Sequence, residues 1–171
     1  MMFDGILKGS DSMLHHSFNA ISNSQSTILI LGSFPSVKSR ENSFYYMHPQ
    51  NRFWIVLSEI YQDDFVNASI EVKQALLNFY HIALYDVIES CDITNSDDSS
   101  IKNVIPTDID QLLQNTQIKH IFLNGKKAVH YFEKYHSNCR IPYNYLPSTS
   151  AANAAYTLPL LIKAWKVIKT H

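Results

Sequence analysis

Four short runs of apolar residues recur along the chain, and each is followed at once by a polar or turn-forming residue. Unbroken runs of this length are typical of parallel strands that are buried on both faces of a sheet. They predict strands at residues 27–31, 82–85, 120–123 and 144–146. Because apolar residues at helical spacing separate these runs, the chain has the alternation of strand and helix that is typical of an α/β domain.

Two of the predicted helices lie next to polar loops. The first is expected to begin at Pro49, because proline is tolerated in the first turn of a helix. Phe53 and Trp54 then begin its apolar face, and core packing explains these two aromatic residues more simply than a role in a site. The last helix is expected to start after Thr157 as its cap and to run almost to the end of the chain.

The helices between them are expected to begin at polar caps. Ser69 is expected to cap a helix that follows the first one. The apolar residues on its expected buried face are Val72, Ala75, Leu76 and Phe79. Thr107, with Asp110 three residues later, resembles a capping box and predicts a brief helix. A further helix is expected after Gly125.

The order of elements predicts a single three-layer α/β/α domain over residues 1–171, with a mostly parallel sheet of about four strands. Residues 1–26 are assigned only loosely, and residues 89–103, crowded with Ser, Asp and Asn, are expected to be a surface loop. Two polar loops, 32–51 and 147–153, follow predicted strands and should open at the same edge of the sheet. We expect the ligand there, because α/β domains bind ligands at the carboxyl ends of their strands.

Composition narrows the classes of protein to which this chain can belong. Its 171 residues are 46% hydrophobic and 17% charged, as in a compact globular domain. A formal net charge of −1 argues against tight non-specific binding of nucleic acid, although it is compatible with a small basic face. Cys91 and Cys139 lie far apart and lack the spacing of metal ligands, so we expect no metal site, and we expect no other cofactor. Two isolated cysteines also suit a reducing cytoplasm. No run reaches the ~20 apolar residues of a membrane span, so we expect a cytoplasmic protein.

The two polar loops carry motifs. These are Gly32-Ser33-Phe34-Pro35, His48-Pro49-Gln50-Asn51-Arg52-Phe53-Trp54 and, in the second loop, Leu146-Pro147-Ser148-Thr149-Ser150. Together they resemble motifs of the uracil-DNA glycosylase superfamily, and most closely those of its hypoxanthine-DNA (deoxyinosine) glycosylase branch. The resemblance spans about residues 29–166, nearly the whole chain. It implies a uracil-DNA glycosylase-like fold and an enzyme that removes deaminated bases from DNA for base excision repair.

One departure from the superfamily pattern lies in the first motif. Mismatch-specific uracil and thymine glycosylases of the superfamily carry an asparagine just before the proline, where it positions the attacking water, whereas this chain has Phe34. The deoxyinosine branch implies instead that Asn51 is catalytic, and the superfamily implies that Tyr46 stacks on the extruded base. We expect Tyr45, Phe34 and Ser33 to complete the base-binding pocket.

The chemistry of glycosidic-bond cleavage indicates roles for three residues. Negative charge develops on the departing base, so donors from Asn51 stabilise the transition state, and its carboxamide also matches the edge of hypoxanthine or uracil. Asn51 can equally bond its own backbone at the start of a helix. His48 can add a donor, contact a phosphate, or only order the turn before Pro49. Asp86, at a predicted strand end, is the remaining candidate for a general base, or else a simple turn acid.

Contacts with DNA are expected from the second loop. Ser148, Thr149 and Ser150 are short donors that can approach a phosphate closely, although the same side chains can cap the following helix. We expect a monomer that acts on double-stranded DNA containing a deaminated base, most simply hypoxanthine. Two alternatives stay open: a uracil or mismatch glycosylase, and a non-catalytic nucleic-acid-binding member of the fold, which Phe34 and the low positive charge would suit.

Overall fold

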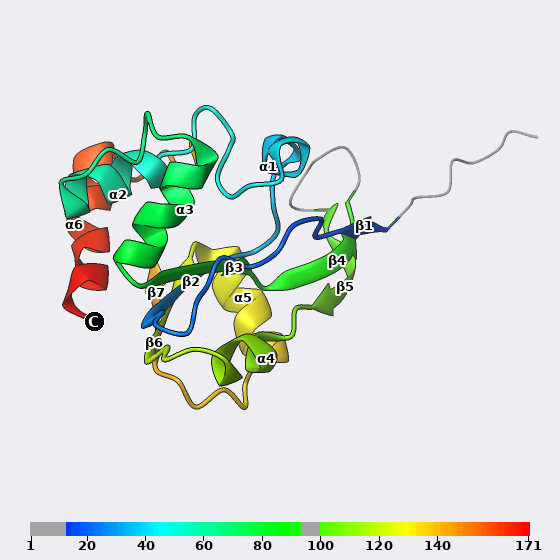
Figure 1. The fold of residues 1–171 in the computed structure, drawn as a ribbon. Coiled ribbons are helices and arrows are strands. Elements are labelled where there is room, and N and C mark those ends of the chain that lie inside the picture. Colours follow the sequence, from blue (N-terminus) through cyan, green and yellow to red (C-terminus); the bar gives the residue numbers. More distant parts are fainter. Residues whose placement is uncertain (1–12, 94–99) are drawn as a thin grey trace, which may run out of the picture.

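A four-stranded parallel sheet forms the centre of the molecule (Figure 1). The structure is a computed structural model that describes residues 13–93 and 100–171. The strands, in the spatial order β3-β2-β6-β7, are β3 (Ile82–Asp86), β2 (Ile28–Gly32), β6 (His120–Asn124) and β7 (Tyr143–Leu146). The predicted strands and their parallel direction are confirmed, because unbroken apolar runs specify strands that are buried on both faces.

Helices cover both faces of this sheet (Figure 1). One layer contains α2 (Phe53–Tyr61), α3 (Ile70–Phe79), α6 (Leu158–Trp165) and the 3₁₀ helix η2 (Lys166–Thr170); the other contains α4 (Ile109–Gln114) and α5 (Lys126–Tyr135). Alternate residues of β2 divide between the layers: Ile28 and Ile30 pack with the first, Leu29 and Leu31 with the second. The expected α/β/α architecture is therefore confirmed, and within the described residues no helix is long and apolar enough to cross a membrane.

A second sheet, which the sequence did not predict, follows directly on β3. It contains β1 (Leu14–His15), β4 (Ile88–Asp92) and β5 (Lys102–Pro106), which pair antiparallel in the order β1-β4-β5. The expectation of a surface loop over 89–103 is therefore wrong for the strand residues, while 94–99, like 1–12 of the N-terminal segment, lie outside the described residues. The sequence of these strands lacks a clear alternation of apolar and polar residues, because β5 is mostly exposed and one of the buried positions of β4 is Ser90. Hydrogen bonds between backbone groups hold the strands together.

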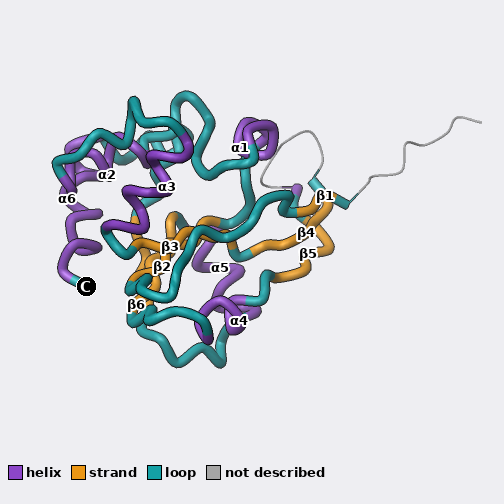
Figure 2. The backbone as a smooth tube through the Cα atoms, viewed as in Figure 1, coloured by secondary structure: helices purple, strands orange, loops and turns teal. Residues whose placement is uncertain are grey.

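The loop between β2 and α2 is more structured than its polar composition indicates. It contains the short helix α1 (Val37–Asn42), which Ser36 caps by accepting a hydrogen bond from the Ser39 N–H. α2 begins at Phe53 instead of Pro49, because a separate turn occupies the intervening residues. Figure 2 draws the backbone between α1 and α2 as a loop. The buried side chains of Phe53 and Trp54 confirm that both belong to the core.

Three helix caps were expected from the sequence. Thr157 is the N-cap residue of α6, but its side chain makes no capping hydrogen bond. Ser69 caps α3 by accepting from the Val72 N–H. α4, in contrast, is capped by the carboxylate of Asp108. The hydroxyl of Thr107 is buried and donates instead to the Asp86 carbonyl at 2.8 Å. A capping motif cannot reveal this contact, because its partner lies 21 residues away in the chain.

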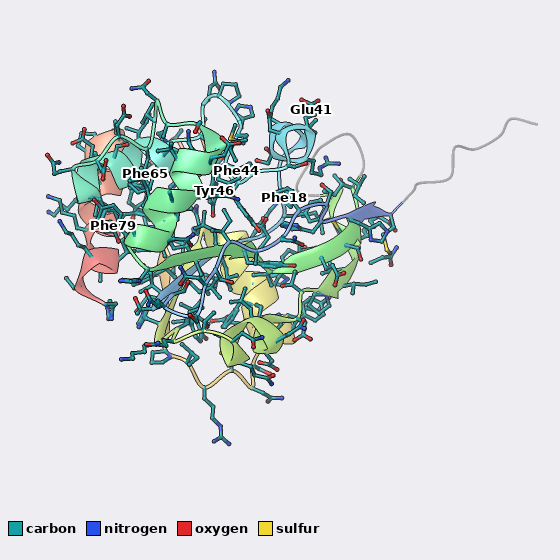
Figure 3. The ribbon with its side chains drawn as sticks, in the orientation of Figure 1. Phe18, Glu41, Phe44, Tyr46, Phe65 and Phe79 are labelled. Carbon is teal, nitrogen blue, oxygen red and sulfur yellow. The ribbon has the colours of Figure 1, made fainter. Side chains whose placement is uncertain are left out.

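α3 buries a different face from the one that its apolar spacing indicates. Its buried residues are Lys73 and Leu77, whereas Val72 and Phe79 (Figure 3) are 48% and 72% exposed. The Lys73 ammonium donates to the Ala68 carbonyl at 2.6 Å. A lysine stem packs against apolar surface when its charged end finds such a partner, and residue types alone do not indicate where this will happen.

Candidate active site

A cavity of about 170 Å³ lies at the carboxyl ends of β2, β3 and β6, at the sheet edge where we expected the site. All candidate site residues except His48 lie in its wall, together with residues that the sequence did not single out. The wall contains Gly32, Ser33, Phe34, Pro35, Ser36, Ser39, Tyr45, Tyr46, Asn51, Asp86, Asn124, Ser148, Thr149 and Ser150. The two motif loops thus meet at one edge of the sheet, because they follow parallel strands.

His48 is the one candidate that the structure places outside the cavity wall. Its side chain is exposed, and its Nδ1 accepts a hydrogen bond from the Gln50 backbone N–H at 3.1 Å. Of the three roles considered for His48, ordering the turn is the one that this geometry supports.

Hydrogen bonds fix the direction of the Asn51 carboxamide. Its Oδ1 accepts from the Phe53 backbone N–H at 3.0 Å and from the Thr149 hydroxyl at 2.9 Å. A backbone N–H can only donate, so the amide oxygen must face α2 and the Nδ2 group is left for a ligand. Both acceptor positions of Oδ1 are used. The expected two-bond contact with a base edge is therefore reduced, in this geometry, to donation from Nδ2.

Asn124, the last residue of β6, orients the partner of Asn51. Its Oδ1 accepts from the Thr149 N–H and its Nδ2 donates to the Thr149 hydroxyl oxygen, both at 3.1 Å. The hydroxyl hydrogen of the fully buried Thr149 then points to Asn51, and a directed chain of hydrogen bonds joins the two motif loops to β6. Asn124 was not predicted as a site residue, although its place at a strand end on the same edge as Asp86 was the available signal.

Tyr46, which is labelled in Figure 3, lines the cavity. One face of its ring stacks on Phe53, with 3.9 Å between ring centroids. Its hydroxyl is buried and makes no hydrogen bond of standard geometry within the described residues, although the Asn124 side chain lies near it. Burial, and after it the charge of Asp86, raises the pKa of Tyr46, so the hydroxyl stays protonated and can donate. Its backbone φ of 54° is unfavourable for a non-glycine residue, and such strain is often found at functional sites.

Asp86 ends β3 beside Gly32 and has an unexpected partner. Its Oδ2 lies 2.8 Å from Nε2 of His16, which is 70 residues earlier in the chain, and the two side chains are 6% and 1% exposed. A Cβ on Gly32 would clash with Asp86 Oδ1 and would lie 3.3 Å from the Tyr46 hydroxyl oxygen. The glycine is therefore what allows both oxygens to approach the end of β2.

The other aromatic candidates support the cavity wall. Tyr45 is buried and donates its hydroxyl to the Asn19 carbonyl at 2.9 Å. Phe34 lies 5.8 Å from the Arg40 guanidinium and edge-on to His16, with 6.4 Å between ring centroids. The phenyl ring thus packs among aromatic and cationic groups, which agrees with the expectation that Phe34 does not orient water.

Arg52 fastens the second motif loop to the start of α2. Its guanidinium donates to the backbone carbonyls of Thr149, Ser150, Asn153 and Tyr156. A planar guanidinium offers several donors in a fixed arrangement, which a lysine ammonium cannot reproduce. This role of Arg52 was not predicted, because backbone carbonyls are present in every residue and residue types do not show which of them a side chain will contact.

Replacing Arg52 by lysine is expected to lower the free energy of unfolding by about 2 kcal/mol, because charge-assisted hydrogen bonds to several carbonyls are lost. Urea unfolding followed by tryptophan fluorescence measures this, since Trp54 and Trp165 are buried. Arg140→Lys is the matched control, because Arg140 is exposed. Equal unfolding midpoints for Arg52→Lys and the wild type would contradict a stabilising role for the contacts between Arg52 and the second motif loop.

A second hollow of about 320 Å³ adjoins the cavity and shares Ser33, Asn124, Ser148 and Ser150 with it. The exposed Lys126, at the start of α5, also lines this hollow. A positive charge and short hydroxyl side chains therefore lie next to the opening of the cavity. In the described part of the chain, no three His, Cys, Asp or Glu side chains gather in a way that would hold a metal ion.

Known proteins of similar sequence cover most of this chain. One relative is the hypoxanthine DNA glycosylase of Methanosarcina acetivorans, which is 30% identical over 146 residues, covering 85% of this chain and 92% of the relative. Another is the hypoxanthine DNA glycosylase of Methanosarcina barkeri, 30% identical over 123 residues, covering 70% and 76% of the two chains.

A solved structure and a family model agree with these relatives. The solution NMR structure of a candidate uracil DNA glycosylase from M. acetivorans superposes with a TM-score of 0.79 and 28% identity, over 90% of this chain and 95% of that one. Residues 18–169 match the sequence model of the uracil DNA glycosylase superfamily. The chain belongs to the uracil DNA glycosylase superfamily.

Proposed function

We propose that this protein is a monofunctional DNA glycosylase that hydrolyses the N-glycosidic bond of hypoxanthine in double-stranded DNA, in base excision repair. The observation that carries this proposal is the cavity at the strand ends, where the Asn51 amide and the Tyr46 hydroxyl offer donors beside an aromatic face. Such a cavity suits a base that has been extruded from the duplex. The proposal is also supported by two relatives, both hypoxanthine DNA glycosylases, that are similar to this protein over most of the chain.

Base binding is assigned to Tyr46 and Asn51. A base must leave the duplex stack before its glycosidic bond can be reached, at a cost of a few kcal/mol, and aromatic contact in the pocket offsets this cost. Tyr46 stacks on the base with its free face while Phe53 supports the ring from behind. Asn51 donates from Nδ2 to the base as negative charge develops on it, and its fixed orientation means that no reorganisation is needed.

Water activation is assigned to Asp86, the one carboxylate among the described residues that line the cavity. The water oxygen bonds to C1′ of the sugar as the C1′–N9 bond breaks, and the electron pair of that bond goes to the base. One proton of the water goes to Asp86 Oδ1, and the base anion takes a proton from solvent. Asp86 thus takes the role that an asparagine at the position of Phe34 has in mismatch-specific members of the superfamily.

Contact with the DNA backbone is assigned to Ser148 and Ser150, with Lys126 beside them. Thr149 is less suited to this role than expected, because its hydroxyl and N–H are both used inside the protein. Ser148 and Ser150 accept local backbone N–H bonds, which leaves their hydroxyl hydrogens for phosphate oxygens. All these groups belong to one chain, so we propose that the protein acts as a monomer.

A panel of duplexes of one sequence, each with a single inosine, uracil or xanthosine nucleotide, tests the proposed function. Hypoxanthine is expected to be released at least about 10-fold faster than uracil, because the pocket must distinguish the bases by size and edge contacts. A normal adenine at the same position is the control and should stay intact. Release of uracil alone would favour a uracil glycosylase, and tight binding without release of any base would favour a non-catalytic domain.

A further inference from the structure

His16 lies behind Asp86, outside the cavity wall, on the segment that follows β1. Its backbone N–H donates to the Glu89 carbonyl of β4 at 2.6 Å, which fastens this segment to the second sheet. The aromatic rings near its imidazole belong to Phe18, Phe34, Tyr45 and Tyr85. The ring is therefore held by packing on several sides and is shielded from solvent.

The hydrogen bonds of His16 fix the position of one proton and leave a second one to be shared. Nδ1 lies 2.7 Å from the Phe18 carbonyl, which can only accept, so Nδ1 carries a hydrogen. The contact between Nε2 and Asp86 Oδ2 then holds one further proton. With that proton on Nε2, an imidazolium faces a carboxylate; with it on Oδ2, a neutral imidazole faces a neutral acid. Only the first state gives Asp86 a carboxylate that can take a proton from water.

The surroundings of the pair contain few other groups that titrate. The phenols of Tyr45, Tyr46 and Tyr85 face it, and desolvation by burial raises the pKa of each of them, so all three stay neutral near neutral pH. Glu89 is the nearby acid on β4, and it is exposed. Within residues 13–93 and 100–171, His16 is the ion-pair partner of Asp86.

We propose that His16 is a positioning residue for base excision: its Nε2–H donates to Oδ2 of Asp86 and orients the carboxylate, so that Oδ1 is presented to the cavity beside Gly32. The proposal rests on the proposed function and extends it to a segment that carries none of the recognised motifs. During the reaction, the proton of the attacking water goes to Asp86 Oδ1, and the imidazolium keeps its own protons. His16 therefore acts through Asp86 and touches no substrate.

His16→Gln and His16→Leu together test this proposal, because glutamine can keep a donor for Asp86 whereas leucine of similar size cannot. Single-turnover release of hypoxanthine is measured for both variants. His16→Leu is expected to be at least about 10-fold slower than the wild type, because Asp86 is no longer held toward the cavity, and His16→Gln is expected to stay within about 3-fold of the wild type. His15→Leu is the matched control, since the neighbouring His15 is exposed and should keep the wild-type rate.

A second variant keeps the test informative if the first one is unstable. Asp86→Asn is expected to be about 100-fold slower than the wild type, and adding His16→Leu to it should cause no further loss, because His16 acts only through Asp86. An equal loss of rate in His16→Gln and His16→Leu, or a wild-type rate for Asp86→Asn, would overturn the proposal. Absence of hypoxanthine release by the wild type would instead refute the proposed function, so the two failures are distinguishable.

Discussion

Replacing Asn51 by alanine is expected to slow single-turnover release of hypoxanthine by about 10²- to 10³-fold, because it removes an oriented donor from the place where negative charge develops. The donor works in a cavity that partly excludes solvent, where its hydrogen bond is stronger than in water. The amide also needs no reorientation during the reaction, since Phe53 and Thr149 hold its oxygen. Rapid-quench measurement of base release with enzyme in excess gives the rate.

Asn51→Asp separates this catalytic role from a structural one. An aspartate keeps an oxygen for the Phe53 N–H and the Thr149 hydroxyl, but it places a second oxygen where Nδ2 was. We expect Asn51→Asp to be at least as slow as Asn51→Ala, because a negative charge would face the departing base. If Asn51 only bonds its own backbone, the aspartate should be nearly as active as the wild type. Gln50→Ala is the control, because Gln50 is the exposed neighbour.

Replacing Gly32 by alanine is expected to slow base release by about 100-fold, a loss typical of a displaced acid–base group. The added methyl would clash with Asp86 Oδ1 and press on the Tyr46 hydroxyl. Neither group can move away at low cost. The other oxygen of Asp86 is held by His16, and the ring of Tyr46 is stacked on Phe53.

The same variant should keep most of its stability, because Gly32 does not require a left-handed backbone. We expect the free energy of unfolding to fall by about 1–2 kcal/mol, as for a modest overpacking. Measuring urea unfolding beside base release therefore separates a misplaced site from a damaged fold. A wild-type rate for Gly32→Ala would contradict the close approach of Asp86 and Tyr46 to the end of β2.

The central sheet and the location of the site were predictable from the sequence. Strands buried on both faces need unbroken apolar runs, and such runs are visible without any partner. The strand ends at Gly32, Asp86 and Asn124 then lie on one edge, because parallel strands that alternate with helices must point the same way. The motifs in the two loops after β2 and β7 indicated membership in the uracil DNA glycosylase superfamily, which the comparisons with known proteins confirm.

The second sheet and part of the helix packing were not predictable in this way. β4 and β5 pair mainly through backbone groups, which every residue type carries, so their sequence looks like a polar loop. The buried Lys73 of α3 is a similar case, because its burial depends on a carbonyl supplied by a neighbouring turn.

Residue types and their order along the chain thus determined the strands, the sheet edge, and the presence of Asn51, Asp86 and Tyr46 near one another. Tertiary structure alone decided which atoms of these residues face a ligand. Thr149 turns the Asn51 amide from 98 residues away, and His16 reaches Asp86 across 70 residues. Hydrogen bonds depend on distances of a few ångström and on direction, and such geometry exists only after distant segments have packed together.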